Sequence, residues 1–215
     1  MAVSMIRTAL GISHNKTALS TWTIQGGMQV CAQATLILTI AHDPGSATGA
    51  VWNGQALTNQ VSNRRAGFIE GSIWTLLSNP TSGAGTITVS WAGQAVTAKA
   101  AVMTQITGVT AVSGTKTGNG DSTVISTGST GTISNTHYIA AGMGIEGVSA
   151  SRSTGVWQLD ANQQGQWRAT SGGGGTTNIV IDEGYAVSQP GGVARSARFS
   201  SIIANDWVGM GWSSC

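Results

Sequence analysis

The stretch Gly71–Val109 constrains the fold most, because it holds three apolar segments separated by turn residues. The segments are Ser72–Ser78, Thr86–Trp91 and Lys99–Ile106. In the second segment every other residue is apolar, which is typical of a strand with one buried face. Pro80 and the glycines that follow it predict a turn. We therefore expect the first two segments to form a hairpin, with the third lying beside them in a meander.

Further β-branched or alternating segments predict strands elsewhere in the chain. The strongest apolar run, Val30–His42, ends at a Pro-Gly turn and predicts a central strand. The dipeptide Asn53-Gly54 inside Ala50–Leu57 predicts a tight hairpin. The other strand candidates are Ser4–Ala9, Thr21–Ile24 (ended by Gly26-Gly27), Thr123–Ser126, Gly131–Ser134, His137–Ile145, Asn178–Val187 and Ala197–Gly211.

Three segments have the composition of connections. Val61–Phe68 is polar and basic, and we expect a loop. Thr110–Asn135 is almost entirely Thr, Ser, Gly and Val, so it is either a low-complexity linker or a set of weak strands under a polar surface. Ser171–Gly175 predicts a flexible glycine tip.

About ten to twelve short strands, without a convincing amphipathic helix, predict an all-β protein. A jelly-roll-like β-sandwich suits a chain of 215 residues and closes two sheets over one core. No internal repeat is visible, and the one candidate boundary, residues 110–135, has similar strands on both sides, so we expect residues 1–215 to form a single domain. Six tryptophans near strand ends are expected to fill the core: Trp22, Trp52, Trp74, Trp91, Trp207 and Trp212.

Charge is unusually scarce in this chain. Only 8% of the residues are charged, against about 25% in an average soluble protein. Such a surface suits a subunit packed in an assembly, or an extracellular protein covered by hydroxyl and amide groups. The formal net charge of +2 is too small to indicate nucleic acid or anionic membranes as partners. No secretory signal or membrane-spanning run is evident, so we expect synthesis in the cytoplasm of the producing cell.

The two cysteines give little chemistry. Cys31 lies in an apolar run and is expected to be a small core residue, whereas Cys215 is the last residue. The sequence leaves undecided whether the two form a disulfide. Neither has neighbouring metal ligands.

No arrangement of residues indicates catalysis. Asp182 and Glu183 are the only adjacent carboxylates, and neighbours on a strand point to opposite faces. The three histidines are isolated, so each is expected to be hydrogen-bonded or exposed rather than a zinc ligand: His14, His42 and His137. No nucleophile elbow or phosphate loop occurs. We expect no enzyme activity, no catalytic residue, no cofactor and no metal.

Two places are candidate contact surfaces. The first is the Trp157–Trp167 segment with Arg168, where aromatic rings stand beside amide and guanidinium donors. Three interpretations stay open for it: core tryptophans around a polar turn, an intermolecular contact, or a glycan site. The second is the pair Arg64 and Arg65, which in a loop would ordinarily be solvated.

Four segments in order carry a resemblance to a known family: Val51–Leu57, Ser72–Pro80, Gly85–Trp91 and Gln105–Val109. They read as a W-N-G-x-A-L hairpin, a W-x-L strand with an N-P turn, a G-T-x-T-V strand and a strand ending T-G-V. This pattern resembles a jelly-roll-like β-sandwich domain of tailed-phage virion proteins, also seen in some bacterial surface proteins. Residues 30–109 match it well and the later half loosely. The resemblance implies a particle component and carries over no catalytic residue.

From this resemblance we expect a structural virion protein, placed as a decoration or cement subunit on the outer capsid surface. Its partners would be the major capsid protein lattice and other copies of itself, with a trimer favoured. The alternative is a tail-associated receptor-binding module that grips host glycan through Trp157, Trp167 and Arg168.

Overall fold

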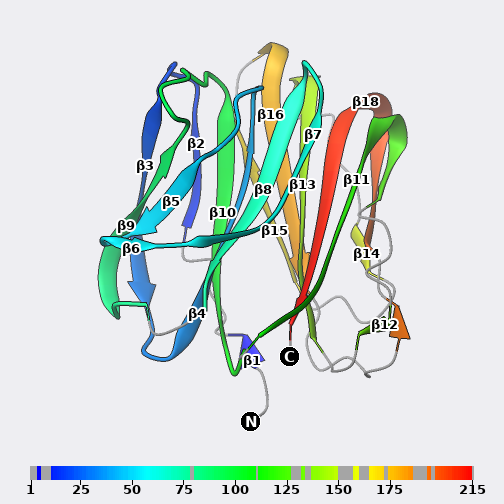
Figure 1. The fold of residues 1–215 in the computed structure, drawn as a ribbon. Coiled ribbons are helices and arrows are strands. Elements are labelled where there is room, and N and C mark those ends of the chain that lie inside the picture. The colour runs from blue at the N-terminus through cyan, green and yellow to red at the C-terminus, as the bar shows by residue number, and fades with distance from the viewer. Residues whose placement is uncertain are drawn as a thin grey trace.

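The computed structural model describes residues 4–5, 11–77, 80–109, 111–126, 132–133, 137–149, 157–159, 165–171, 174–185, 193–194 and 197–214. These residues form eighteen strands, β1 to β18, and contain no helix. All strand pairs named below are antiparallel. Within the described ranges no helix is long and apolar enough to cross a membrane. The predicted all-β sandwich is confirmed, but it has three layers instead of the expected two sheets over one core (Figure 1).

The middle layer is a six-stranded sheet, here called the central sheet, in the order β1-β10-β4-β8-β7 with β2 also paired to β10. Its strands are β1 (Ser4–Met5), β2 (Gly11–Asn15), β4 (Ala34–His42), β7 (Thr58–Arg65), β8 (Ile69–Leu76) and β10 (Lys99–Thr107). Every residue of β4 is buried, because a layer covers each face of this sheet. The prediction of a central strand at Val30–His42 is therefore confirmed for its second part.

One outer layer is the N-terminal outer sheet, ordered β3-β9-β5-β6. Its strands are β3 (Thr21–Val30), β5 (Gly49–Trp52), β6 (Gln55–Ala56) and β9 (Gly83–Ser90). Asn53 and Gly54 both have positive φ, 43° and 86°, and join β5 to β6 in the expected tight hairpin. The core between this sheet and the central sheet contains Trp22, Trp52, Trp74 and Trp91, none more than 5% exposed.

The other layer is the C-terminal outer sheet, ordered β11-β18-β13-β16-β15 with β14 paired to β18. Its strands are β11 (Val112–Ser126), β13 (His137–Ser149), β14 (Trp157–Leu159), β15 (Gly165–Thr170), β16 (Gly174–Tyr185) and β18 (Ala197–Ser214). A separate pair consists of β12 (Thr132–Ile133) and β17 (Val193–Ala194). Trp207 and Trp212 of β18 are buried, which confirms all six tryptophans as core residues. The single-domain organisation of residues 1–215 stays a prediction.

The predicted meander at Gly71–Val109 is wrong, although its three segments are strands. β8 pairs with β4 and β7, whereas β9 pairs with β3 and β5 in the facing sheet. β10 pairs with β4 instead of lying beside β9. The chain crosses between layers after Leu77, so Trp74 of β8 and Val89 of β9 meet across a core. Two apolar faces in succession bury more surface by facing each other than by lying edge to edge.

Three further expectations are corrected. Val61–Phe68 is mostly strand β7 and not a loop: it is the edge strand of the central sheet, with Val61 turned inward between polar neighbours. Gly26-Gly27 does not end the second strand, because β3 continues through a register shift between Ile24 and Met28. Cys31 is an exposed free thiol and not a core residue, since the chain turns away from β3 there.

The polar stretch after Gly108 contains a long strand. Of the two alternatives for Thr110–Asn135, the structure supports strands, because β11 runs over fifteen residues and pairs with β18. The predicted tip at Ser171–Gly175 overlaps the start of β16 at Gly174, and residues 172–173 lie outside the described ranges, as does Cys215.

Candidate functional site

Five polar side chains stand in register across one end of the central sheet. The directly opposed residues are Asn15, Lys99, His42, Glu70 and Arg64, from β2, β10, β4, β8 and β7 in that order. Opposed residues in a sheet share a face, so this polar row continues the face that lower down packs on the N-terminal outer sheet. The face of the central sheet that forms the apolar core with the N-terminal outer sheet therefore carries polar side chains at this end.

Within the polar row, Lys99 lies between Asn15 and His42, and its side chain is fully shielded from solvent. Its ammonium donates to three backbone carbonyls, those of Val96, Thr97 and Thr17, at 2.8, 3.0 and 2.7 Å. It also lies 5.9 Å from the ring centroids of both Trp22 and Trp91. Burial lowers the pKa of Lys99 to about 8, although the nearby Asp43 carboxylate opposes that shift. These contacts fasten the β2–β3 and β9–β10 connections to the central sheet.

His42 is buried beside Lys99 and is uncharged at neutral pH. Burial lowers its pKa to about 4, and the positive charge of Lys99 adds to the effect. Its Nδ1 lies 2.6 Å from the carbonyl oxygen of Asp43, which can only accept, so Nδ1 carries the proton. The ring meets that of Trp91 edge to face at 5.4 Å. The expectation that His42 is a hydrogen-bonded histidine is confirmed, as is an exposed His14.

Asp43, at the end of β4, holds the neighbouring connection. Its Oδ2 accepts the backbone N–H of Ala98 at 2.7 Å. Burial raises the pKa of Asp43, while this hydrogen bond and the ammonium of Lys99 oppose the rise. The loop that begins at Asp43 leads to β5 and forms one wall of a surface hollow.

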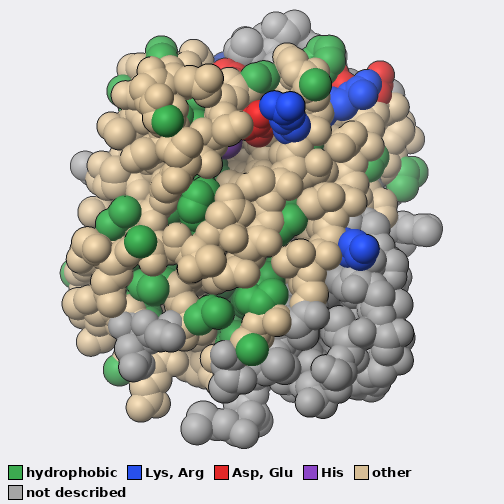
Figure 2. Space-filling model, in the orientation of Figure 1, with side chains coloured by type: hydrophobic (Ala, Val, Ile, Leu, Met, Phe, Trp, Pro, Cys, Tyr) green, Lys and Arg blue, Asp and Glu red, His purple; other side chains and the backbone are tan. Residues whose placement is uncertain are grey.

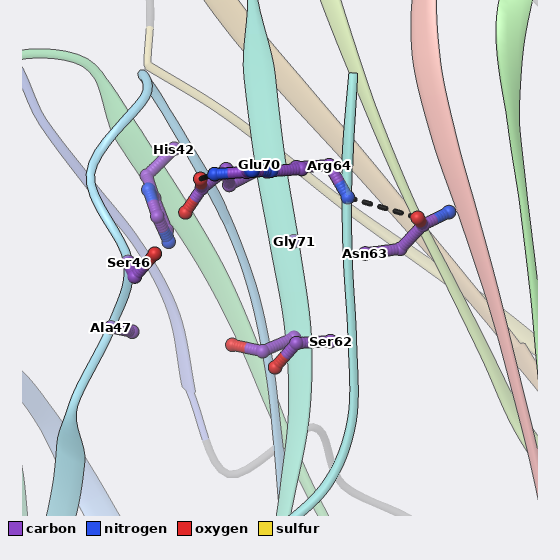
Figure 3. A pocket seen from close by; sticks show the side chains of 9 residues that line it. His42, Ser46, Ala47, Ser62, Asn63, Arg64, Glu70 and Gly71 are labelled. Atoms are coloured by element: carbon purple, nitrogen blue, oxygen red, sulfur yellow. Dashed lines mark hydrogen bonds and ion pairs between the residues drawn. The ribbon is translucent and has the colours of Figure 1, made fainter. Parts of the chain in front are cut away.

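The hollow has a volume of about 320 Å³ and lies between strands β7 and β8 of the central sheet and the loop that joins β4 to β5 (Figure 3). Its floor comes from the central sheet and its wall from the β4–β5 loop. The lining residues are His42, Ser46, Ala47, Ser62, Asn63, Arg64, Glu70, Gly71 and Ser72. Charged side chains are sparse on this side of the molecule and gather near this end (Figure 2).

Two hydroxyl groups on the floor of the hollow are fixed by side-chain donors. Ser72 Oγ accepts from Trp74 Nε1 at 2.7 Å, and Ser62 Oγ accepts from Asn59 Nδ2 at 2.7 Å. Each serine oxygen thus has a donor, which leaves its own hydrogen to donate.

Glu70 and Arg64 form the charged part of the hollow. Their closest charged atoms are 3.9 Å apart, which is too long for a hydrogen bond. The Glu70 side chain is only 13% exposed, whereas that of Arg64 is 69% exposed. The carboxylate oxygens of Glu70 therefore face the hollow. The long side chain of Arg64 supplies hydrogen-bond donors at its rim.

A second buried acid lies between the central and C-terminal outer sheets. Glu183 of β16 accepts hydrogen bonds from Thr39 of β4 and from Thr104 of β10, the latter at 3.0 Å. Burial raises the pKa of Glu183 to about 7, and the two hydroxyl donors oppose the rise. This carboxyl joins two layers and has no opening in the described surface.

The predicted contact residues Arg64 and Arg65 occupy adjacent positions on β7 and leave it on opposite faces. Arg64 lines the hollow. Arg65 Nε donates to Asp206 Oδ1 of β18 at 2.9 Å, and its guanidinium lies 6.0 Å from the ring of Phe68. The structure thus separates the two arginines: one borders a hollow, and the other ties two layers together.

The other predicted contact residues lie in the C-terminal outer sheet. Trp157 is on β14 opposite Phe199, whereas Trp167 and Arg168 are on β15 opposite Glu183 and Asp182. Their side chains lie outside the part described, so a shared contact surface stays a prediction.

Sequence reasoning missed the polar row and the hollow. His42 lies on β4, Glu70 and Ser72 lie on β8 and Ser62 lies on β7, and none of them sits in a local motif. The one available signal is Glu70 itself, a carboxylate next to an apolar strand segment. Across the described residues no group of three or more His, Cys, Asp and Glu side chains is placed to hold a metal ion.

Comparison with known proteins adds no relative. The chain matches no family model, no curated protein and no solved structure.

Proposed function

We propose that this protein is a structural component of a tailed-phage particle, a decoration or cement subunit bound to the outer surface of the assembled capsid. It would act as a homo-oligomer, with a trimer favoured, at junctions of the major capsid protein lattice. Binding only the assembled lattice stabilises that lattice by mass action. The motif resemblance at residues 30–109 is the reason for naming a phage particle.

The observation that carries the proposal is how the buried ionisable groups are used. The Lys99 ammonium donates to backbone carbonyls, and the Glu183 carboxyl accepts from threonine hydroxyls of the facing sheet. Arg65 and Asp206 add a tie between the same two layers. Groups that elsewhere serve catalysis here cross-link connections and layers, as a load-resisting scaffold requires. A surface with few charges suits broad contact with neighbouring subunits.

The test uses the phage or prophage whose genome encodes the chain. Particles made without the protein should lose infectivity faster on heating and in chelator, and adding the purified protein back should restore resistance. Add-back of an unrelated protein of similar size is the control. Equal resistance with and without the chain would overturn the proposal.

The tail-associated receptor-binding module is the second candidate, and the strand-borne Trp167 and Arg168 are the residues to test. Binding of host envelope glycans that is lost in Trp167→Ala would favour it over the capsid role. Absence of any binding to host envelope material would count against it.

A further inference from the structure

The hollow beside β7 and β8 has features that the shell role does not use. Three properties of its lining matter: its charge, its hydrogen-bonding groups and its size. This inference does not rest on the proposed capsid function, because it concerns a ligand of the isolated chain.

The charges in the lining cancel. Arg64 contributes one positive and Glu70 one negative charge, and their 3.9 Å separation leaves both able to bind a third group. His42 is neutral, and the remaining lining residues carry no charge. A ligand with net charge would gain little here, because it would meet repulsion from one of the two groups.

The hydrogen-bonding groups are mixed in kind. Ser62 and Ser72 have hydrogens left to donate, since their oxygens already accept from Asn59 and Trp74. Arg64 also donates, and Glu70 accepts. A ligand that matches this set must both donate and accept from neighbouring atoms. Sugar hydroxyl groups do so, whereas a purely accepting anion or a purely donating cation does not.

A volume of about 320 Å³ is at the small end of ligand sites, which suits one sugar ring and not an extended chain. We propose that the hollow formed by Ser62, Arg64, Glu70 and Ser72 binds a single neutral sugar residue. Among the described lining residues Ala47 alone has an apolar side chain, so few apolar contacts are available and binding should be weak.

The experiment titrates the full chain with the methyl glycosides of glucose, galactose, mannose and N-acetylglucosamine, followed by ligand-observed NMR. At least one should bind saturably. Glu70→Gln should weaken it about tenfold, because it replaces a charged acceptor of sugar hydroxyls. Ser46→Phe, at an exposed position on the wall, should abolish binding by filling the hollow. Asp121→Asn removes an exposed carboxylate from β11 and should leave binding unchanged.

Thermal unfolding of each variant verifies its fold, and Ser46→Phe keeps the test decisive if Glu70→Gln does not fold. N-acetylneuraminate and glucosamine serve as charged comparison probes. The proposal is overturned if no neutral glycoside binds, if binding survives both hollow variants, or if a charged probe binds more tightly than every neutral one. None of these outcomes affects the capsid proposal, which is tested on particles.

Discussion

Thr104 Oγ1 donates a 3.0 Å hydrogen bond to Glu183 Oε1, and this contact joins the central sheet to the C-terminal outer sheet. Thr39 donates to the other carboxyl oxygen. Burial raises the pKa of Glu183 from 4.5 to about 7, so between these pH values the folded protein holds a proton that the unfolded chain has lost. The contribution of Glu183 to stability is therefore greatest at low pH and falls as the pH rises through this window, whereas His42, whose pKa burial lowers from 6.5 to about 4, contributes the opposite trend.

Glu183→Gln imitates the protonated acid and tests this directly. We expect the variant to lose the fall in stability that Glu183 causes between pH 4.5 and about 7, to keep the rise with pH that His42 causes, and to exceed the unchanged chain by about 3 kcal/mol above that window. Urea unfolding across this pH range measures it, and Asp121→Asn controls for loss of one carboxylate. A variant that is less stable at every pH would contradict the assignment.

Lys99→Met should destabilise the fold by about 2 kcal/mol or more, because one buried and two part-buried carbonyls lose a charged donor. Met preserves most of the side-chain volume between Trp22 and Trp91. Chemical denaturation provides the free energy of unfolding. Lys116→Met, at an exposed position on β11, is the matched control, and equal stability of the two variants would refute the role given to Lys99.

Trp52→Phe should cost more stability than Trp91→Phe. The indole N–H of Trp52 donates to the carbonyl of Thr81 at 3.0 Å, whereas that of Trp91 has no acceptor among the described residues. Trp91→Phe removes an unsatisfied buried donor, which offsets part of the stability lost with the smaller ring. Trp52→Phe removes a satisfied donor and leaves the Thr81 carbonyl without its hydrogen bond. We expect a difference of about 1 to 2 kcal/mol in the free energy of unfolding. The reverse order would contradict the hydrogen-bond assignment.

Gly54→Ala should destabilise the β5–β6 hairpin by about 1 kcal/mol, because Gly54 has a φ of +86° that disfavours a Cβ. Gly49→Ala is its matched control: both sites have open space around the added carbon, and Gly49 lacks a positive φ. Thermal unfolding compares the two. Equal effects would mean that the backbone angle at Gly54 is not the cause.

Alternation and turn residues in the sequence predict where strands lie, because both depend on neighbours along the chain. The Asn53-Gly54 hairpin and the buried tryptophans follow from such local signals. Pairing does not follow, since β8 and β9 are close in sequence yet belong to facing sheets. The sequence of edge strand β7 predicts a loop because seven of its eight residues are polar and Val61 is its one apolar residue.

The residues that line the hollow could not be grouped from the sequence for the same reason. His42, Glu70 and Arg64 are brought together only by the register of β4, β8 and β7, and register is set by the pairing of whole strands. The adjacent Arg64 and Arg65 predict one contact surface, yet consecutive residues of a strand point to opposite faces. The sequence identifies Glu70 as a carboxylate next to an apolar strand segment. Its partners lie on other strands, and the order of those strands in the sheet does not follow from the sequence.

The capsid role is the central claim, and electron microscopy of particles labelled with gold-conjugated antibody against this chain tests it most directly. Particles from a strain lacking the gene are the control for background labelling. We expect gold distributed over the whole shell at regular lattice positions. Gold confined to the tail, or particles that carry no chain at all, would contradict it.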